Sequence, residues 1–218
     1  MSGFLLKCIG ILTMTIDHVG AIWFPQVEWL RWVGRLAFPI FCFFLVEGWD
    51  KTRDRRNYLL RLLMFAVLSE IPFQWGIHQR VGFYGQNVLF TLLLGAVAMI
   101  LWEIGQKGNR WVSIFGIAGI CLLAEFLQTD YASFGVLMIL GYFVFQGNFR
   151  RQALVMTVLT IGFALSGRMW VGEIAALVAL LPLYRYNGQR GRGMKYFFYV
   201  FYPVHLLLLR AVGPWLFS

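Results

Sequence analysis

The sequence is poor in charged residues. Asp, Glu, Lys and Arg together make up 13% of its 218 residues, about half the share found in an ordinary soluble domain. Hydrophobic residues make up 60% of the chain, and its mean hydropathy is +0.69. No polar stretch is long enough to form a separate soluble domain. The composition therefore predicts a single membrane-embedded domain over residues 1–218.

The chain also lacks the cysteine patterns and short motifs of several site classes. Cys8, Cys42 and Cys121 lie in apolar segments without CxxC or Cys/His ligand spacing. Neither a disulfide framework nor a zinc site is indicated, and no metal is predicted. There is no Walker A motif, no GxGxxG after a strand, no GxSxG and no HExxH. The first residues, MSGFLLKCIG, contain no A-x-A-like cleavage site, so we expect the first apolar segment to remain as a helix.

What the sequence does contain is a series of long apolar runs bounded by Gly, Pro, Asn and charged residues. Each run is about long enough to cross a bilayer, which takes about 20 residues. The predicted crossings are residues 4–24, 30–49, 57–77, 86–104, 110–127, 131–146, 151–167, 169–186 and 195–213. The predicted fold is an all-α integral membrane bundle of about nine transmembrane helices. Eight or ten crossings stay open, because the run at 131–146 is short and the run at 169–186 holds Glu173 and Pro182.

The basic residues of the loops predict the orientation. If the N-terminus lies in the cytoplasm, most Lys and Arg residues fall on the cytoplasmic side, and the outer side receives only Arg31, Arg80, Arg168 and Arg210. This bias is the positive-inside pattern, and it places the C-terminus outside a bacterial-type plasma membrane. The formal net charge of +9 is then explained by topology signals beside anionic lipid, and nucleic-acid binding is not predicted.

Polar and ionisable residues inside the predicted helices gather at one depth. A rise of about 1.5 Å per residue places them in the outer leaflet. They are Asp17, His18, Arg35, Glu70, Gln86, Asn87, Thr91, Glu125, Glu173 and His205. Charge is rare inside a membrane, so this much of it in one layer favours a water-accessible cavity that faces outward. The alternative is mutual pairing: Asp17 or Glu70 with Arg35, and His205 with a backbone carbonyl.

Within this layer, His18 is the natural general base, because imidazole has a reference pKa near neutrality and two distinct ring nitrogens. Asp17 is adjacent to it in the sequence, but neighbouring residues on a helix diverge by about 100 degrees and do not face each other. Asp17 is therefore assigned to Arg35 or to a group in the last helix. The residue that orients His18 is expected to come from another helix, with Glu70 and Tyr202 as candidates.

Two cytoplasmic loops hold more basic residues than orientation requires. They are DKTRDRRNY, after the second crossing, and YRYNGQRGRGMKY, after the eighth. Backbone amides and guanidinium groups in such loops could close around phosphates. The candidate phosphate ligands are Arg53, Arg55, Arg56, Arg190, Arg192 and Lys195. A plain solvated loop fits the same composition.

Several segments together resemble the TraX family, which is named after the conjugation protein implicated in N-acetylating F-pilin. The segments are KCIGILTMTIDHVGAIWF, WVGRLAFPIFCFFLVEGWDKTRDRRNYLLRLL, SEIPFQW, GQNVLFTLLLG and YNGQRGRGMKYFFYVFYPVHLLLL. The resemblance is strongest at the two ends of the chain. The DH pair, the GRxAFP segment and the FYPxH segment match at Asp17, His18, Arg35, Tyr202, Pro203 and His205.

The resemblance implies a multi-pass membrane acyltransferase that takes acetyl from cytoplasmic acetyl-CoA. The expected catalytic residues are His18, Asp17, Arg35, Glu70 and His205, and the expected substrate-binding residues are Gln86, Asn87, Tyr202 and Glu173. His18 would take the acceptor's proton, while Arg35, Asn87 or a donor in the last helix would stabilise the oxyanion. An acyl-histidine intermediate is an alternative route.

The sequence leaves other functions open. A proton-coupled transporter could use the same Asp, Glu and His residues, although no convincing internal repeat is seen. A non-enzymatic membrane assembly factor could use them as structural ion pairs. The bilayer and acyl-CoA are the predicted partners. The acceptor, whether glycan, peptide or small molecule, stays open, and so does assembly into a homo-oligomer.

Overall fold

The structure is a computed structural model that describes residues 1–79, 82, 84–167, 171–193 and 195–216, and these residues form helices without any β-strand. The long helices are α1 (Gly3–Ile22), α3 (Ala37–Lys51), α4 (Arg55–Phe73), α5 (Val88–Gln106), α6 (Arg110–Phe126), α7 (Ala132–Val144), α8 (Phe149–Leu165) and α10 (Lys195–Leu216). The short ones are α2 (Glu28–Gly34), η1 (Gln74–His78), η2 (Val171–Ala179) and α9 (Leu180–Tyr184). The prediction of an all-helical chain is confirmed for this part of it.

Five helical segments within the described ranges are long and apolar enough to cross a membrane. They are Gly3–Ile22, Glu28–Lys51, Arg55–His78, Val88–Gln106 and Tyr196–Gly213. Two shorter apolar helical segments, Ala132–Val144 and Val171–Tyr184, accompany them. These lengths support a helical membrane protein, while the nine crossings and the sides of the two termini stay predictions. Of the outer arginines on which the orientation rests, Arg80 and Arg168 lie outside the described residues.

The predicted crossing over 30–49 lies within the helical segment Glu28–Lys51. That segment is interrupted at Arg35 and Leu36, between the end of α2 and the start of α3. Pro39 lies in the first turn of α3, where its missing N–H removes no intrahelical hydrogen bond. At the end of α2, the backbone N–H of Arg35 donates to the carbonyl oxygens of Arg31 and Trp32, both at 3.2 Å. The interruption lies at Arg35, whose side chain is 11% exposed.

Two other predicted helices change their hydrogen-bond pattern near a candidate site residue. The helix over 57–77 ends in the π-helical turn η1, just after Pro72 in α4. The helix over 169–186, of which residues 169 and 170 lie outside the described chain, contains the 3₁₀ helix η2 with Glu173. A 3₁₀ helix of nine residues is unusual, and π-turns and 3₁₀ stretches often lie at functional sites.

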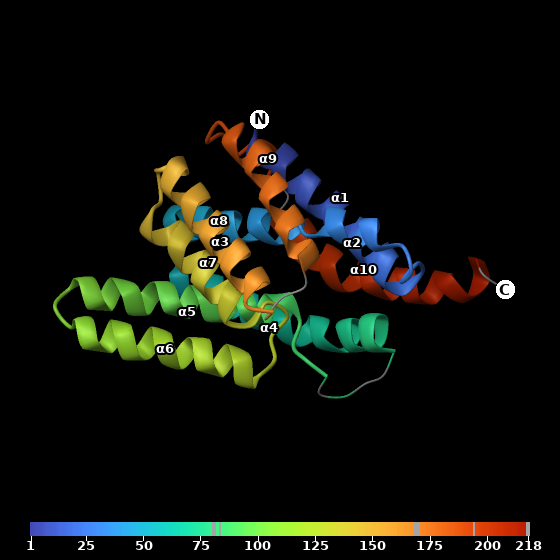
Figure 1. Cartoon of the computed structure of the whole chain (residues 1–218), viewed down its shortest axis with the longest axis horizontal. Coiled ribbons are helices and arrows are strands. Elements are labelled where there is room, and N and C mark those ends of the chain that lie inside the picture. The colour runs from blue at the N-terminus through green and yellow to red at the C-terminus, as the bar shows by residue number, and fades with distance from the viewer. Residues whose placement is uncertain (80–81, 83, 168–170, 194, 217–218) are drawn as a thin grey trace. The chain divides into compact units, whose positions relative to one another are not determined.

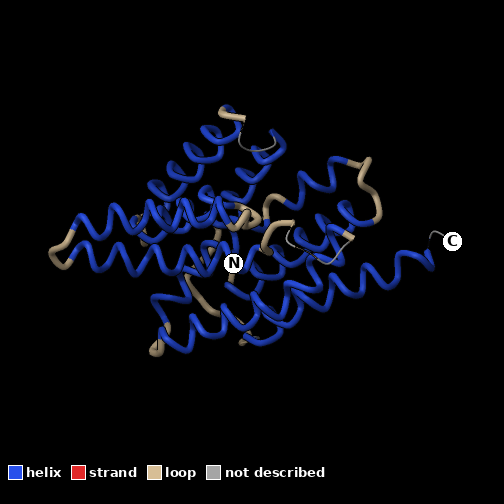
Figure 2. The backbone as a smooth tube through the Cα atoms, turned by 90° about the horizontal axis from the view of Figure 1, so that it is seen from below, coloured by secondary structure: helices blue, strands red, loops and turns tan. Residues whose placement is uncertain are grey.

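The chain divides into two compact units. Unit 1 comprises Met1–Phe41, Leu68–Gly82 and Met156–Ser218, and unit 2 comprises Cys42–Val67 and Phe83–Val155. In unit 2, α5 and α6 form a hairpin (Figures 1 and 2). Its helices approach closely, because a Cβ on Gly105 would lie 2.3 Å from the Cβ of Ser113. Such close approach at small residues is typical of helix packing in membranes. The single functional domain predicted from the sequence stays a prediction.

In unit 1, α1 packs against both α2 and α10. A Cβ on Gly20 of α1 would lie 2.7 Å from the Cβ of Leu30 in α2. Near the end of α1, the indole N–H of Trp23 donates to the carbonyl oxygen of Leu209 in α10, at 2.9 Å. These contacts join the two ends of the chain, and they bring the polar residues in the middle of α1 against those of α10.

Candidate functional site

Two buried histidines face each other between α1 and α10. His18 is 9% exposed and His205 is 5% exposed, and Nδ1 of His18 lies 2.6 Å from Nε2 of His205. Nδ1 of His205 lies 2.8 Å from the carbonyl oxygen of Phe201, one turn earlier in α10. A carbonyl oxygen can only accept a hydrogen bond, so Nδ1 of His205 carries the proton that it donates there.

That hydrogen bond fixes the protonation pattern of the neutral pair. Because Nδ1 of His205 carries its proton, its Nε2 has a lone pair and accepts from Nδ1–H of His18. Nε2 of His18 is then the unprotonated nitrogen of that ring. This nitrogen has no hydrogen-bond partner among the residues that the structure describes. The arrangement provides one ring nitrogen able to take a proton.

Aromatic rings hold the pair in place. The ring of Phe201 stacks on His205 at 4.8 Å between centroids and an interplanar angle of 8°. The ring centroid of His18 lies 4.9 Å from that of His205, with an interplanar angle of 24°, and the two rings meet at the edges that carry Nδ1 of His18 and Nε2 of His205. Buried Tyr202 lies near both, with its ring centroid 6.1 Å from His18 and 5.8 Å from His205. These contacts leave little freedom for the ring of His205 to turn.

The predicted partner of His18 is corrected by this geometry. Glu70 and Tyr202 were the candidates, but His205 occupies Nδ1 of His18. The carboxylate of Glu70 instead accepts a hydrogen bond from the side-chain amide of Gln74, at 2.7 Å. The predicted hydrogen bond of His205 to a backbone carbonyl is also present, so its ring contacts both His18 and the carbonyl oxygen of Phe201.

Beside the histidines, four charged residues of the described chain form a network. Asp17 accepts from Nη2 of Arg35 and from Nη1 of Arg31, both at 2.7 Å. Nη1 of Arg35 donates to Glu173 at 2.6 Å. The network joins α1, the α2–α3 break and η2, and its two positive and two negative charges balance. The pairing of Asp17 with Arg35 that helical geometry predicted is present.

Arg31 is a network residue that the sequence prediction missed. It was counted only as one of the few basic residues on the outer side, and it is partly exposed, at 32% of its side chain. Its guanidinium group also donates to the backbone oxygen of Asp17, at 3.1 Å. The available signal was its spacing of four residues from Arg35, which places both side chains on one helix face.

Arg35 fits a scaffold better than the predicted oxyanion stabiliser. Its Nη1 and Nη2 bind the carboxylates of Glu173 and Asp17, and its Nε donates to the backbone oxygen of Arg31 at 3.2 Å. All three guanidinium nitrogens therefore have protein oxygens as partners. Glu173, predicted as a substrate-binding residue, is 6% exposed and is one of those partners.

Gly34 allows this network to form. A Cβ built on Gly34 would lie 2.0 Å from Oδ1 of Asp17 and 2.2 Å from its Cβ. Real Cβ atoms do not approach other atoms so closely, and the two arginines hold Asp17 in place. Only glycine at this position lets α2 approach α1 closely enough for both arginines to reach the carboxylate.

The substitution Gly34→Ala is accordingly expected to destabilise the folded protein by about 1–3 kcal/mol, the usual cost of overpacking. Thermal unfolding of the purified protein in detergent measures the change. Gly119→Ala in α6 is the matched control, since a Cβ there meets no atom within 4 Å and alanine favours helix. Equal melting temperatures for the two variants would contradict the proposed close contact.

The predicted polar layer divides between the two units. Asp17, His18, Arg35, Glu70, Glu173 and His205 belong to unit 1, whereas Gln86, Asn87, Thr91 and Glu125 belong to unit 2. In unit 2 these side chains serve the local fold. Asn87 caps α5, accepting from the N–H of Leu89 at 3.0 Å and donating to the carbonyl of Ala66 at 2.8 Å. Glu125 accepts from the hydroxyl of Ser133 at the start of α7.

The six candidate phosphate ligands are likewise divided, with Arg53, Arg55 and Arg56 in unit 2 and Arg190, Arg192 and Lys195 in unit 1. Asp54, which lies between Arg53 and Arg55 in the sequence, caps α4. The backbone N–H of Asn57 donates to its carboxylate and holds the pKa of Asp54 below its ordinary value. Arg190 and Arg192 are exposed, and the side chain of Lys195 lies outside the described part. Binding of one ligand by all six stays a prediction.

The loop around Arg190 and Arg192 packs against the start of the chain. The N–H of Gly3 donates to the carbonyl oxygen of Gln189 at 2.7 Å, and the N–H of Asn187 donates to that of Met1 at 3.1 Å. Gly191 has a φ of +69°, and a Cβ on it would lie 2.9 Å from the Cβ of Phe4. Its close approach, as well as its φ, requires glycine. This packing accounts for part of the glycine content of the loop without a phosphate ligand.

A family model and two relatives match nearly the whole chain, and a third relative matches part of it. The family described as TraX protein matches residues 2–213. A probable fimbrial assembly protein FimC, serogroup H1, of Dichelobacter nodosus is 32% identical over 95% of this chain and 94% of its own length. Protein TraX of Escherichia coli is 24% identical over 96% and 86%. Uncharacterized protein RP591 of Rickettsia prowazekii is 30% identical over 63% and 54%. No solved structure matches the chain.

Proposed function

This chain belongs to the TraX family, and from that premise we propose that it is a membrane-bound acyltransferase of a bacterial membrane. It moves an acetyl or other short acyl group from acyl-CoA to a hydroxyl or amine of an acceptor. The observation that carries the proposal is the His18–His205 pair, in which one buried ring nitrogen is left without a partner among the described residues. Such a nitrogen is what a general base needs.

In the proposed reaction, Nε2 of His18 takes the proton of the acceptor O–H or N–H. The acceptor oxygen or nitrogen attacks the thioester carbonyl, and a carbon–oxygen or carbon–nitrogen bond replaces the carbon–sulfur bond. The thiolate of coenzyme A leaves and takes the proton back from His18. Direct transfer in this way needs no other reactant, and general base catalysis contributes about a hundredfold to ten-thousandfold in rate.

His205 is assigned as a positioning residue. When Nε2 of His18 takes a proton, the ring becomes an imidazolium, and its Nδ1–H is already directed at Nε2 of His205, 2.6 Å away. A hydrogen bond to a charged donor is stronger than one to a neutral donor. The carbonyl of Phe201 keeps His205 in the tautomer that can accept. The pair therefore stabilises the state in which the proton has left the acceptor.

The charged network supports the pair from the neighbouring residue of α1. Asp17 is fixed by two arginines, and fixing Asp17 also fixes the backbone from which His18 projects. The charges of its four described residues balance, so these residues anchor three segments without adding net charge to the membrane interior. Arg31, Arg35 and Glu173 are supporting residues in this proposal.

An assay with the purified full-length protein in lipid nanodiscs tests the proposal. Release of coenzyme A from acetyl-CoA is measured with a panel of cell-surface glycans and peptides as acceptors, and His18→Ala should abolish acceptor-dependent release. His78→Ala is the matched control, because His78 contacts Phe73 rather than the pair. If the wild-type protein transfers no acyl group from acyl-CoA to any acceptor, the proposal is overturned.

The printed name of the Dichelobacter nodosus relative, a probable fimbrial assembly protein, favours a second candidate function. In that case this chain would be a membrane assembly factor, and the buried ion pairs would only be structural. The two functions separate in cells: a surface structure that still assembles with His18→Ala, but not after loss of the protein, would support the assembly factor.

A further inference from the structure

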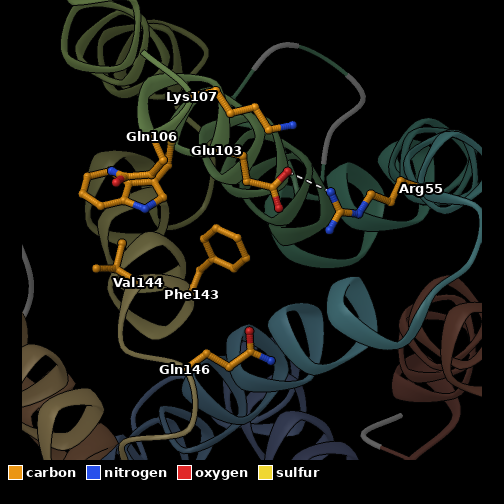
Figure 3. A pocket seen from close by; sticks show the side chains of 8 residues that line it. Arg55, Glu103, Gln106, Lys107, Phe143, Val144 and Gln146 are labelled. Carbon is orange, nitrogen blue, oxygen red and sulfur yellow. Dashed lines mark hydrogen bonds and ion pairs between the residues drawn. The ribbon is translucent and has the colours of Figure 1, made fainter. Parts of the chain in front are cut away.

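Unit 2 contains a pocket that the proposed chemistry of His18 does not use. Its volume is about 500 Å³, within the usual range for small-molecule sites. The pocket lies where α5 and α7 end and α4 begins, with the side chains of α4, α5 and α7 around it (Figure 3). The Lys/Arg bias of the sequence predicts that these helix ends lie on the cytoplasmic side.

The pocket is lined by two cationic side chains, one held in an ion pair and one exposed. The guanidinium group of Arg55 is held in the wall, because it pairs with Glu103 at 2.8 Å and lies 4.7 Å from the ring centroid of Trp49. Lys107, directly after α5, is exposed, and its ammonium has no partner among the described residues. Since Glu103 offsets only one of the two cations, the pocket keeps a net positive charge that suits a phosphate.

The remaining lining suits a flat heterocycle. Trp102 and Phe143 supply aromatic surface, on which a purine can stack. Gln106 and Gln146 each carry a side-chain amide without a partner in the described chain. An amide can donate one hydrogen bond and accept another from the paired polar atoms of an adenine edge. A lipid headgroup would use the cations but leave these amides and rings without a role.

We infer that this pocket binds the phosphorylated adenosine end of the coenzyme A thioester, an inference that rests on the proposed acyltransferase function. The phosphate lies against Lys107 with Arg55 behind it, the purine stacks on the aromatic wall, and Gln106 or Gln146 bonds its edge. This reading retains Arg55 from the predicted phosphate ligands, and it adds Lys107 as the main one.

Binding of coenzyme A and of adenosine 3′,5′-bisphosphate to the full-length protein tests the inference. Calorimetry in nanodiscs of phosphatidylcholine alone removes competing anionic lipid. Lys107→Gln is expected to raise the Kd of both ligands about tenfold, the usual effect of losing one charge-assisted hydrogen bond. Arg110→Gln is the matched control, since it removes one exposed positive charge at the start of α6 without lining the pocket.

The possible outcomes separate this inference from the proposed function. If Lys107→Gln and Arg110→Gln bind coenzyme A equally well while His18→Ala still loses turnover, the pocket assignment is wrong and the acyltransferase stands. If Lys107→Gln weakens coenzyme A binding and Arg110→Gln does not, but no acceptor is acylated, the pocket assignment is supported and the acyltransferase function is refuted. If Lys107→Gln instead reduces retention of phosphatidylglycerol and leaves coenzyme A binding unchanged, the pocket is a lipid site and the inference is overturned.

Discussion

His18→Ala is expected to lower acyl transfer about a thousandfold, within the usual range for a general base, and adding His205→Ala is expected to lower it little further. The reason is the shared hydrogen bond: His205 acts only through Nδ1 of His18. Once His18 is absent, His205 has nothing to orient. Residues that act as one unit show such non-additive losses.

His205→Ala alone is expected to cost about a hundredfold in kcat, at the lower end of general-base effects, with little change in KM. Without its partner, His18 can turn or adopt the other tautomer, but its ring is still present. His205→Gln should recover part of the rate, because its side-chain oxygen can accept from Nδ1 of His18, as Nε2 of His205 does. His205→Leu, which cannot accept, should behave like alanine.

The measurement is steady-state transfer for both single variants and the double variant, with folding checked by thermal unfolding. If the single losses multiply in the double variant, the two histidines act independently and the proton-sharing pair is refuted. Equal rates for His205→Gln and His205→Leu would also contradict it, because only one of them can accept the hydrogen bond.

Much of the fold could be predicted from the apolar runs. Each of the nine predicted ranges overlaps helical residues in the structure, because burial of backbone groups in lipid requires helices. The breaks could not be predicted in the same way. The interruption at Arg35 and the 3₁₀ helix around Glu173 lie where side chains contact other segments. Apolar composition does not predict such contacts.

The site was predicted only in part, because depth places residues in a layer but does not identify neighbours. Depth and helical geometry paired Asp17 with Arg35. The contact between His18 and His205 joins positions 187 residues apart, and one sequence does not show that the first and last helices are adjacent. For the same reason, Gln86 and Asn87 were grouped with the histidines, although they belong to the other unit.

The buried network yields the second large effect. Arg35→Met is expected to lower the free energy of unfolding by about 3–5 kcal/mol, the cost of leaving a buried charge without its partner. Glu173 causes most of this loss, since only 7% of its side chain is exposed and it loses the ion pair that it forms with Nη1 of Arg35 at 2.6 Å. Asp17 suffers less, because Arg31 still binds it at 2.7 Å.

This asymmetry predicts a rescue. Adding Glu173→Gln to Arg35→Met removes the negative charge that Arg35 no longer neutralises and leaves Asp17 paired with Arg31, so the double variant should be more stable than Arg35→Met alone. Unfolding in detergent, analysed as a double-mutant cycle, measures the coupling. Arg55→Met is the control: its pair with Glu103 has the arginine 48% exposed, and exposed pairs contribute about 1 kcal/mol or less.

The rescue also separates the scaffold role of Arg35 from a catalytic one. If Arg35 only holds α1 against η2, the double variant should regain both stability and acyl transfer, since the His18–His205 pair is unchanged. If stability returns but transfer does not, the guanidinium group acts on the substrate, and the assignment of Arg35 as a supporting residue is wrong. A double variant less stable than either single variant would contradict the rescue and would show that Glu173 stabilises the fold mainly through contacts other than its ion pair with Arg35.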